Sequence, residues 1–177
     1  MKKLLLHICC APCGASVLKA LKDDFKISFF WNNPNIYNLN EYNNRKDSAK
    51  RYAQELGVEF FQLDNFEYDY QLWKNQSNEI CSNCYQLRLK EAAAFAKNKG
   101  FDFFSTSLLS SPYQKHNIIK DICAELASNL SVEFLYRDFR EFFYAGKNEM
   151  REKGYYLQKY CACEKSYFER FHRGEKK

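Results

Sequence analysis

Short apolar runs alternate with helix-like segments along almost the whole chain, and this alternation constrains the fold more than any other feature. The runs expected to form strands are residues 4–8, 25–31, 58–63, 101–105 and 132–136. Helices are predicted after the first strand and over residues 41–56, 82–99 and 114–127. This order is typical of a mostly parallel sheet with helices on both faces. We therefore expect one Rossmann-like α/β domain over residues 1–171 and a solvated tail at residues 172–177.

The composition supports a folded protein outside the membrane. Its hydrophobic fraction of 46% is enough for a core. No apolar run approaches the roughly 20 residues that cross a bilayer, and the run at 4–8 is too short for a signal peptide. We therefore expect a cytoplasmic protein without a membrane partner. The net charge of +5 permits an anionic partner without demanding one.

Seven of the eight cysteines fall into three clusters, a pattern typical of a thiolate site. The clusters contain Cys9, Cys10 and Cys13, then Cys81 and Cys84, then Cys161 and Cys163. Two of them contain C-x-x-C spacing, which lets two thiolates reach one centre, and two such pairs supply the four ligands of zinc or of an iron–sulfur cluster. Both pairs lie at predicted helix N-termini, where the helix dipole favours the thiolate. The spacing leaves the choice of metal open.

The remaining cysteines differ in kind. A disulfide between Cys161 and Cys163 closes a small, strained ring, and strained disulfides are easily reduced, so the pair suits electron relay. The same two thiols suit a second metal equally well. Cys123 lies on the apolar face of its predicted helix and is expected to be a buried core residue.

The carboxyl ends of the predicted strands locate the site. Ligands of parallel sheets bind beyond these ends. The first cysteine cluster follows the first strand, and Ser105-Thr106-Ser107 ends the fourth. The first strand leads into cysteines where nucleotide-binding domains carry a glycine-rich loop, which disfavours ATP or NAD. His7 is expected to be a hydrogen-bonded core histidine.

Aromatic and basic residues alternate near the third cluster. Tyr155, Tyr156 and Tyr160 are interleaved with Lys153 and Lys159. This segment is expected either to stack RNA bases and hold phosphate or to be an ordinary amphipathic surface.

Several motifs, taken together and in order, resemble those of the QueH-type epoxyqueuosine reductases. The resemblance covers residues 4 to about 168 and is carried by His7–Gly14, Asn33–Ile36, Glu41-Tyr42 with Arg45, Cys81–Tyr85 with Arg88-Leu89, Phe104–Leu108 with Ser111-Pro112, and Tyr156–Cys163. It implies a fold like that of the adenine-nucleotide α-hydrolases (HUP class), without nucleotide hydrolysis. It also implies the last step of queuosine synthesis, in which epoxyqueuosine at the wobble position of certain tRNAs loses its epoxide oxygen.

The same resemblance implies roles for the cysteines. Cys9, Cys10, Cys81 and Cys84 would hold a [4Fe–4S] cluster, Cys161 and Cys163 would form the redox-active catalytic pair, and Cys13 would help to ligate a further iron. The partners would be the modified tRNA and an external electron donor. Some relatives have a non-thiol ligand where this chain has Cys13. Ala162 stands where glycine is expected, and it would strain a disulfide that needs a positive φ there.

Two other functions fit parts of the pattern. A zinc-stabilised RNA-binding module without catalysis would use the two C-x-x-C pairs and the basic end of the chain. An ATP-using tRNA sulfur-transfer enzyme can share both fold and cluster, but it should carry a pyrophosphate loop after the first strand.

Overall fold

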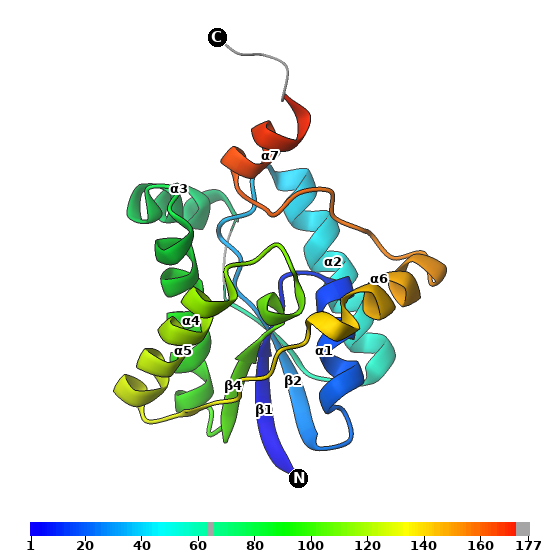
Figure 1. Cartoon of the computed structure of the whole chain (residues 1–177), viewed down its shortest axis with the longest axis vertical. Helices are drawn as coiled ribbons and strands as arrows, with labels where there is room; N and C mark the ends of the chain where they lie inside the picture. Colours follow the sequence, from blue (N-terminus) through cyan, green and yellow to red (C-terminus); the bar gives the residue numbers. More distant parts are fainter. Residues whose placement is uncertain (64–65, 173–177) are drawn as a thin grey trace.

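Five parallel strands form one central sheet in the computed structural model, which describes residues 1–63 and 66–172 (Figure 1). Their order is β3-β2-β1-β4-β5, and every neighbouring pair is parallel. The strands are β1 (Lys2–His7), β2 (Phe25–Trp31), β3 (Phe60–Gln62), β4 (Phe103–Thr106) and β5 (Glu133–Phe134). This order is that of doubly wound sheets, so the predicted Rossmann-like α/β class is confirmed. Of the expected tail, only His172 lies within the described residues.

Helices cover both faces of the sheet. Figure 1 shows α1, α2 and α6 on one side and α4 and α5 on the other. The helices are α1 (Ala11–Leu21), α2 (Leu39–Leu56), α3 (Phe66–Ser77), α4 (Cys81–Asn98), α5 (His116–Leu130), α6 (Phe143–Glu152) and α7 (Glu164–Phe171), with short 3-10 helices η1 (Ser107–Ser110) and η2 (Arg140–Phe142). No helix within the described ranges is both long and apolar enough to cross a membrane.

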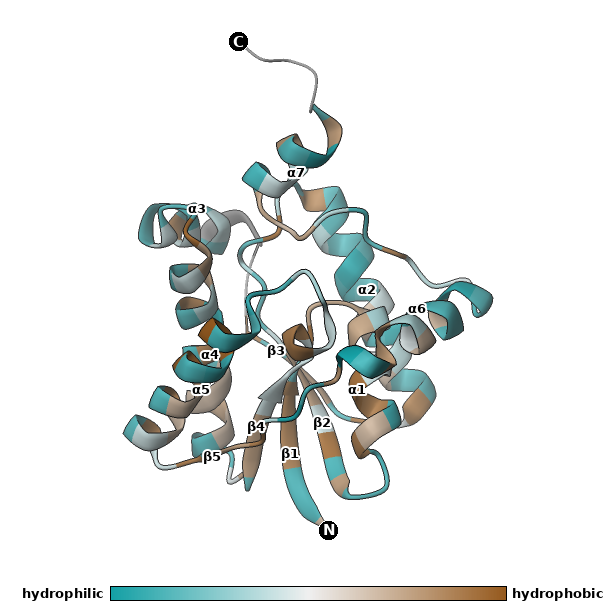
Figure 2. Ribbon diagram, in the orientation of Figure 1, coloured by the Kyte–Doolittle hydropathy of each residue, from teal (hydrophilic) through white to brown (hydrophobic). Residues whose placement is uncertain are grey.

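The core lies on both faces of the central strands. Leu4, Leu5 and Leu6 of β1 are fully buried, because β1 lies between β2 and β4 and is covered by helices on each side. Figure 2 shows the hydrophobic colour concentrated on these strands, whereas α2 is largely hydrophilic. The edge strands β3 and β5 are shorter and only partly buried. The core therefore fixes the carboxyl end of β1, where the first cysteine cluster begins.

The predicted elements are confirmed in kind, and their bounds differ mainly at the edges of the sheet. β2 has the predicted bounds, whereas the fifth strand has only two residues, Glu133–Phe134. The helix expected over 114–127 runs from His116 to Leu130. Helices α3 and α7 were not predicted. In α3 the side chains buried in the core are Tyr70 and Trp73, and α7 has no buried residue among those described, so neither gives an apolar repeat.

One close helix contact places α6 beside the start of α1. Gly146 of α6 is buried, and a Cβ atom there would lie 2.7 Å from the backbone nitrogen of Ser16 and 2.9 Å from the carbonyl oxygen of Pro12. Only glycine allows this approach. Because Pro12 lies in the first turn of α1, the contact holds α6 against the segment that carries the cysteines.

Candidate metal and redox site

Three buried thiols converge where β1 ends and α1 begins. The Sγ atoms of Cys9, Cys10 and Cys13 all lie within 4.8 Å of one another. Cys10 is the N-cap of α1, and Cys13 lies in its first turn, after Pro12. No other group of three or more histidine, cysteine or acidic side chains in the described residues gathers its ligand atoms this closely. We call these three residues the thiol triad.

The surroundings of the triad favour a thiolate at Cys9. Hydrogen bonds from the Cys10 and Cys13 thiols hold the pKa of Cys9 well below its usual value, against the effect of burial. Ser107 adds to this effect, because its hydroxyl donates to the Cys9 sulfur over 3.4 Å while accepting the Cys9 backbone N–H. Burial raises the pKa of Cys10. Buried thiols with one favoured thiolate are suitable ligands for a soft metal.

Arg88 of α4 interacts with a cysteine of the second cluster and with one of the triad. Its Nη1 lies 3.9 Å from the Cys84 sulfur, and its charge also lowers the pKa of Cys9. Its Nη2 donates to the Asn33 side-chain oxygen over 2.7 Å. Cys81 and Cys84 lie in the first turn of α4, as predicted, with Cys84 buried and Cys81 exposed. The structure thus brings three of the expected ligands into one compact group and leaves Cys81 and Cys84 outside it.

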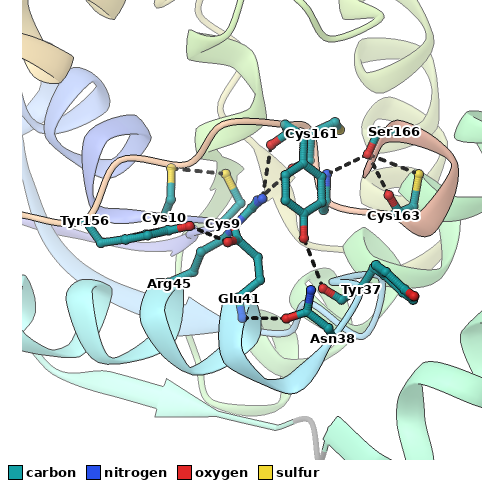
Figure 3. Close-up of polar contacts among 12 residues, drawn as sticks. Cys9, Cys10, Tyr37, Asn38, Glu41, Arg45, Tyr156, Cys161, Cys163 and Ser166 are labelled. Carbon is teal, nitrogen blue, oxygen red and sulfur yellow. Dashed lines mark hydrogen bonds and ion pairs between the residues drawn. The ribbon is translucent and has the colours of Figure 1, made fainter. Parts of the chain in front are cut away.

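The third cluster is held by a buried ion pair in α2. We call residues 160–163 the CxC strap (Figure 3). Arg45, which is 1% exposed, donates from Nη1 to the Cys161 carbonyl over 2.6 Å and from Nη2 to the Tyr160 carbonyl over 3.0 Å. Its Nε donates to Glu41 over 2.6 Å, and the Tyr156 hydroxyl donates to the same carboxylate. Burial opposes the charge of Arg45, but Glu41 outweighs it and the Arg45 pKa is raised.

The first turn of α2 also fixes the strap. Asn38 caps this helix by accepting the Glu41 backbone N–H over 2.9 Å. The Tyr37 backbone N–H donates to the Ala162 carbonyl over 2.9 Å, and the Tyr160 hydroxyl donates to the Tyr37 carbonyl. Both strap cysteines are free thiols, and in this form Ala162 is not among the described residues with positive φ. Strain in a Cys161–Cys163 disulfide therefore stays a prediction.

Cys161 faces the triad across a pocket. Cys9, Cys13, Arg45, Arg88, Gln114 and Cys161 are among the residues that line it. Gln114 donates from Nε2 to the Cys161 sulfur over 3.3 Å, and its oxygen accepts the Tyr85 hydroxyl over 2.8 Å. Cys163 is a free thiol that contacts the Ser166 hydroxyl instead. The pocket therefore joins Cys9 and Cys13 of the triad with one cysteine of the strap at the carboxyl edge of the sheet.

The structure also decides several expectations about single residues. His7 is fully buried, and its ring nitrogens contact Thr106 Oγ1 at 3.0 Å and the Asn32 carbonyl at 3.1 Å, which confirms a hydrogen-bonded core histidine. Burial lowers its pKa to about 3. Cys123 is fully buried in α5, as expected. Ser107 lies against Cys9, as the position of the fourth strand indicates.

Sequence reasoning missed the clamp formed by Glu41 and Arg45. The only sequence feature that could have indicated this pair is the i,i+4 spacing of the two residues, and that spacing usually indicates an exposed helical ion pair. Two of the three tyrosines that were candidates for base stacking serve this clamp, whereas Tyr155 packs edge-on against Tyr52. Tyr156 binds Glu41, and the ring of Tyr160 lies below the Arg45 guanidinium at 5.3 Å.

Comparison with known proteins agrees with these observations. The family model described as "Epoxyqueuosine reductase QueH" matches residues 4–169. The protein of that name from Dehalococcoides mccartyi is 34% identical over 96% of this chain and 94% of its own length, and that from Haemophilus influenzae is 32% identical over 91% and 70%. Among solved structures, the U34-tRNA thiolase NcsA from Methanococcus maripaludis with its [4Fe–4S] cluster is 13% identical, with a TM-score of 0.44 over 86% of this chain and 66% of its own. The family match and the relatives from Dehalococcoides mccartyi and Haemophilus influenzae show that the chain belongs to the epoxyqueuosine reductase QueH family.

Proposed function

We propose that this chain reduces epoxyqueuosine to queuosine at the wobble position of tRNA. The observation that carries the proposal is that Cys9 and Cys13 of the thiol triad line one pocket together with Cys161, in a chain of this family. Removal of the epoxide oxygen yields an alkene and water, and it consumes two electrons and two protons. A protein for this reaction needs a source of electrons beside the place where the epoxide binds, and the thiols of Cys9, Cys13 and Cys161 in the lining of one pocket support this assignment.

The cysteines fit an iron–sulfur cluster as its protein ligands. We assign Cys9, Cys10, Cys81 and Cys84 to a [4Fe–4S] cluster and Cys13 to a further iron. The chemistry of the donors supports this assignment, because the triad is a buried set of soft sulfur ligands. Cys84 also lies 3.9 Å from Arg88, the residue whose charge lowers the pKa of Cys9. A bound cluster supplies electrons one at a time.

Cys161 and Cys163 are assigned the two-electron step. Oxidation of their two thiols to a disulfide releases two electrons and two protons, which balances the conversion of one epoxide to an alkene and water. An external electron donor then returns the disulfide to two thiols. Gln114 holds the Cys161 sulfur at the pocket, and the backbone bonds from Arg45 hold the strap that carries it.

The cationic side chains of the pocket stabilise negative charge. Arg88 and Arg45 are both buried there, and each interacts electrostatically with Cys9. Their positive charges favour the thiolate form of Cys9 over the thiol. A substrate that enters this pocket meets the guanidinium of Arg88 beside the thiols, while that of Arg45 is paired with Glu41.

The direct test is anaerobic reconstitution with iron and sulfide, followed by an assay on tRNA that carries epoxyqueuosine. Formation of queuosine-containing tRNA is expected. Failure of the fully loaded protein to form it would reject the proposal. A preparation made without oxygen that contains one zinc, no iron and no visible colour would favour the zinc-stabilised RNA-binding module.

A further inference from the structure

The tyrosines that are free to meet a partner differ from those that the sequence suggested. Tyr155, Tyr156 and Tyr160 are buried or engaged in the clamp beside the strap. Tyr113 and Tyr144, by contrast, are 77% and 65% exposed. Tyrosine rings exposed to this degree are accessible to a base that stacks on them.

These two exposed tyrosines belong to one continuous row of rings. Tyr113 lies in the segment between η1 and α5, and it meets Phe143 at the start of α6 edge-on, with ring centres 6.0 Å apart. Phe143 in turn meets Tyr144 edge-on at 5.2 Å. In Figure 1 the loop that follows η1 runs beside the first turn of α6. We call Tyr113, Phe143 and Tyr144 the aromatic ladder.

The ladder lies next to the pocket that Cys9, Cys13 and Cys161 line. Ser111 and Gln114, which flank the Pro112-Tyr113 pair, both line that pocket. Gln114 donates to the Cys161 sulfur. The pocket also contains an unused hydrogen-bond acceptor, because the side-chain oxygen of Gln158 is buried there without a partner in the described residues. A ligand that offers an N–H or O–H donor, as the edge of a nucleobase does, would satisfy it.

Uncompensated positive charge accompanies the ladder. Lys115 is exposed two residues after Tyr113, and the ammonium of Lys147 lies 5.9 Å from the centre of the Phe143 ring. Neither lysine forms an ion pair with any residue that the structure describes. Exposed rings with unpaired lysines nearby are suited to the bases and phosphates of single-stranded nucleic acid.

A second group of aromatic rings, on α7, is less suited to this role. The ring of Tyr167 contacts those of Phe168 and Phe171, with ring centres 5.5 and 5.0 Å apart. Tyr167 and Phe168 also contact Tyr37, whose backbone binds the strap. These rings therefore anchor α7 beside the strap, and they leave the ladder as the more open surface.

We infer that the aromatic ladder, with Lys115 and Lys147, is the docking face for a single-stranded RNA loop. The inference rests on the proposed function, since it makes this loop the anticodon loop of the tRNA substrate. Bases next to the wobble nucleotide stack on Tyr113 and Tyr144, the lysines contact the neighbouring phosphates, and the wobble nucleotide is directed toward the mouth of the pocket.

The test uses an anticodon stem–loop RNA with unmodified guanosine at the wobble position, bound to the full chain and measured by fluorescence anisotropy. Tyr113→Ala and Tyr144→Ala are each expected to weaken binding by roughly 5- to 150-fold, and Tyr113→Phe to retain it. Lys147→Gln should reduce the slope of log affinity against log salt by about one. Tyr136→Ala is the matched control, because Tyr136 is an exposed tyrosine with Lys120 over its ring and does not line the pocket.

Two results would overturn the inference. One is wild-type affinity in both alanine variants of the ladder, and the other is a loss in Tyr136→Ala equal to theirs. If the thermal unfolding of the variants is unchanged, a loss of affinity comes from the removed side chain and not from unfolding of the protein. The outcome is separate from that of the proposed function. A wild-type protein that forms queuosine while the ladder variants bind RNA normally defeats only the docking face, whereas a loaded wild-type protein that forms none defeats the function.

Discussion

The guanidinium of Arg45 binds the backbone carbonyl of Cys161 over 2.6 Å, although 116 positions separate them in the sequence. This contact connects the first turns of α2 with the segment that carries the proposed catalytic thiols. Arg45 donates to a second strap carbonyl and to Glu41 as well, so most of its donors are used. The position of Cys161 at the pocket therefore depends on a buried ion pair that binds the strap through its backbone carbonyls.

Loss of Arg45 is expected to destabilise the protein strongly. Arg45→Met leaves the buried Glu41 without its cationic partner, which should cost about 3–5 kcal/mol in the free energy of unfolding. Changing both residues, as in Glu41→Leu with Arg45→Met, should recover part of this loss because no uncompensated charge remains. Urea unfolding of the metal-free protein measures all four members of the cycle.

A matched control for this cycle lies in the same helix. Arg51 and Glu55 form an exposed i,i+4 pair, with the arginine side chain 52% exposed. Arg51→Met should change the free energy of unfolding by less than about 1 kcal/mol. Equal losses for Arg45→Met and Arg51→Met would contradict a structural role for the buried pair.

The proposed ligand set predicts how iron content responds to single substitutions. Serine at Cys9, Cys10, Cys81 or Cys84 should abolish the four-iron cluster, since each removes one of four thiolates. Cys13→Ser should retain the cluster and lower total iron. Iron and acid-labile sulfide per chain, measured on oxygen-free protein, test this. Cys123→Ala is the control, because that thiol is fully buried in α5 away from the triad; a loss of iron there would show that the losses elsewhere reflect unfolding.

The strap cysteines should separate catalysis from metal binding. Cys161→Ser is expected to leave the absorbance of the cluster nearly intact and to abolish turnover. Cys163→Ser and the double variant should lose about as much activity as Cys161→Ser, because two thiols that form one disulfide act as a unit. Visible absorption spectra and the tRNA assay are measured on the same samples. A collapse of iron content in Cys161→Ser would make the strap a metal ligand.

The sheet and the first part of the site could be predicted because they depend on local pattern. The buried run of β1 and the cysteines at its end identified the thiol triad, and Ser107 follows from the parallel alignment of β4 with β1. The clamp of Arg45 could not be predicted in this way. Its partners come from a distant segment, and spacing cannot tell a buried charge pair from an exposed one.

Two helices show the same limit. α3 buries Tyr70 and Trp73 against a small cluster beside Cys84, and α7 packs its aromatic rings against Tyr37. Each helix is stabilised by a surface patch of another element and has no continuous apolar stripe of its own. A pattern search for a repeat of 3.6 residues therefore finds neither, and their positions depend on tertiary contacts.

The close approach of α6 to α1 predicts a strong effect of one added methyl group. Gly146→Ala places a Cβ atom against the backbone of Ser16 and Pro12, which cannot move aside as a side chain does. Overpacking of this kind should cost about 1–3 kcal/mol in the free energy of unfolding. Ala145→Ser, at the exposed neighbouring position, should change it by less than about 0.5 kcal/mol. Urea unfolding measures both, and equal stability of the two variants would show that α6 does not rest on α1.

The turn that leads into α6 should be sensitive to acid through Asp138. Hydrogen bonds from Arg140 lower the pKa of Asp138 to about 2, below the value near 3.9 of an unfolded chain. A depressed carboxyl pKa stabilises the fold above the unfolded value, and this contribution is lost as the pH falls through the folded one. The Asp138 side chain is 41% exposed, so solvent screening limits its contribution at neutral pH to less than about 1 kcal/mol.

Asp138→Asn should therefore be slightly less stable than the wild type at pH 7, and the difference should narrow as the pH falls from about 4 toward 2, where both chains carry a neutral side chain. High salt should narrow it at neutral pH too, because the pair with Arg140 is exposed. Urea unfolding across this pH range measures the difference. Since Asp138 and Arg140 precede the first turn of α6, a difference that stays constant with pH would assign their effect to the shape of the turn and leave no role for the charge of the carboxylate.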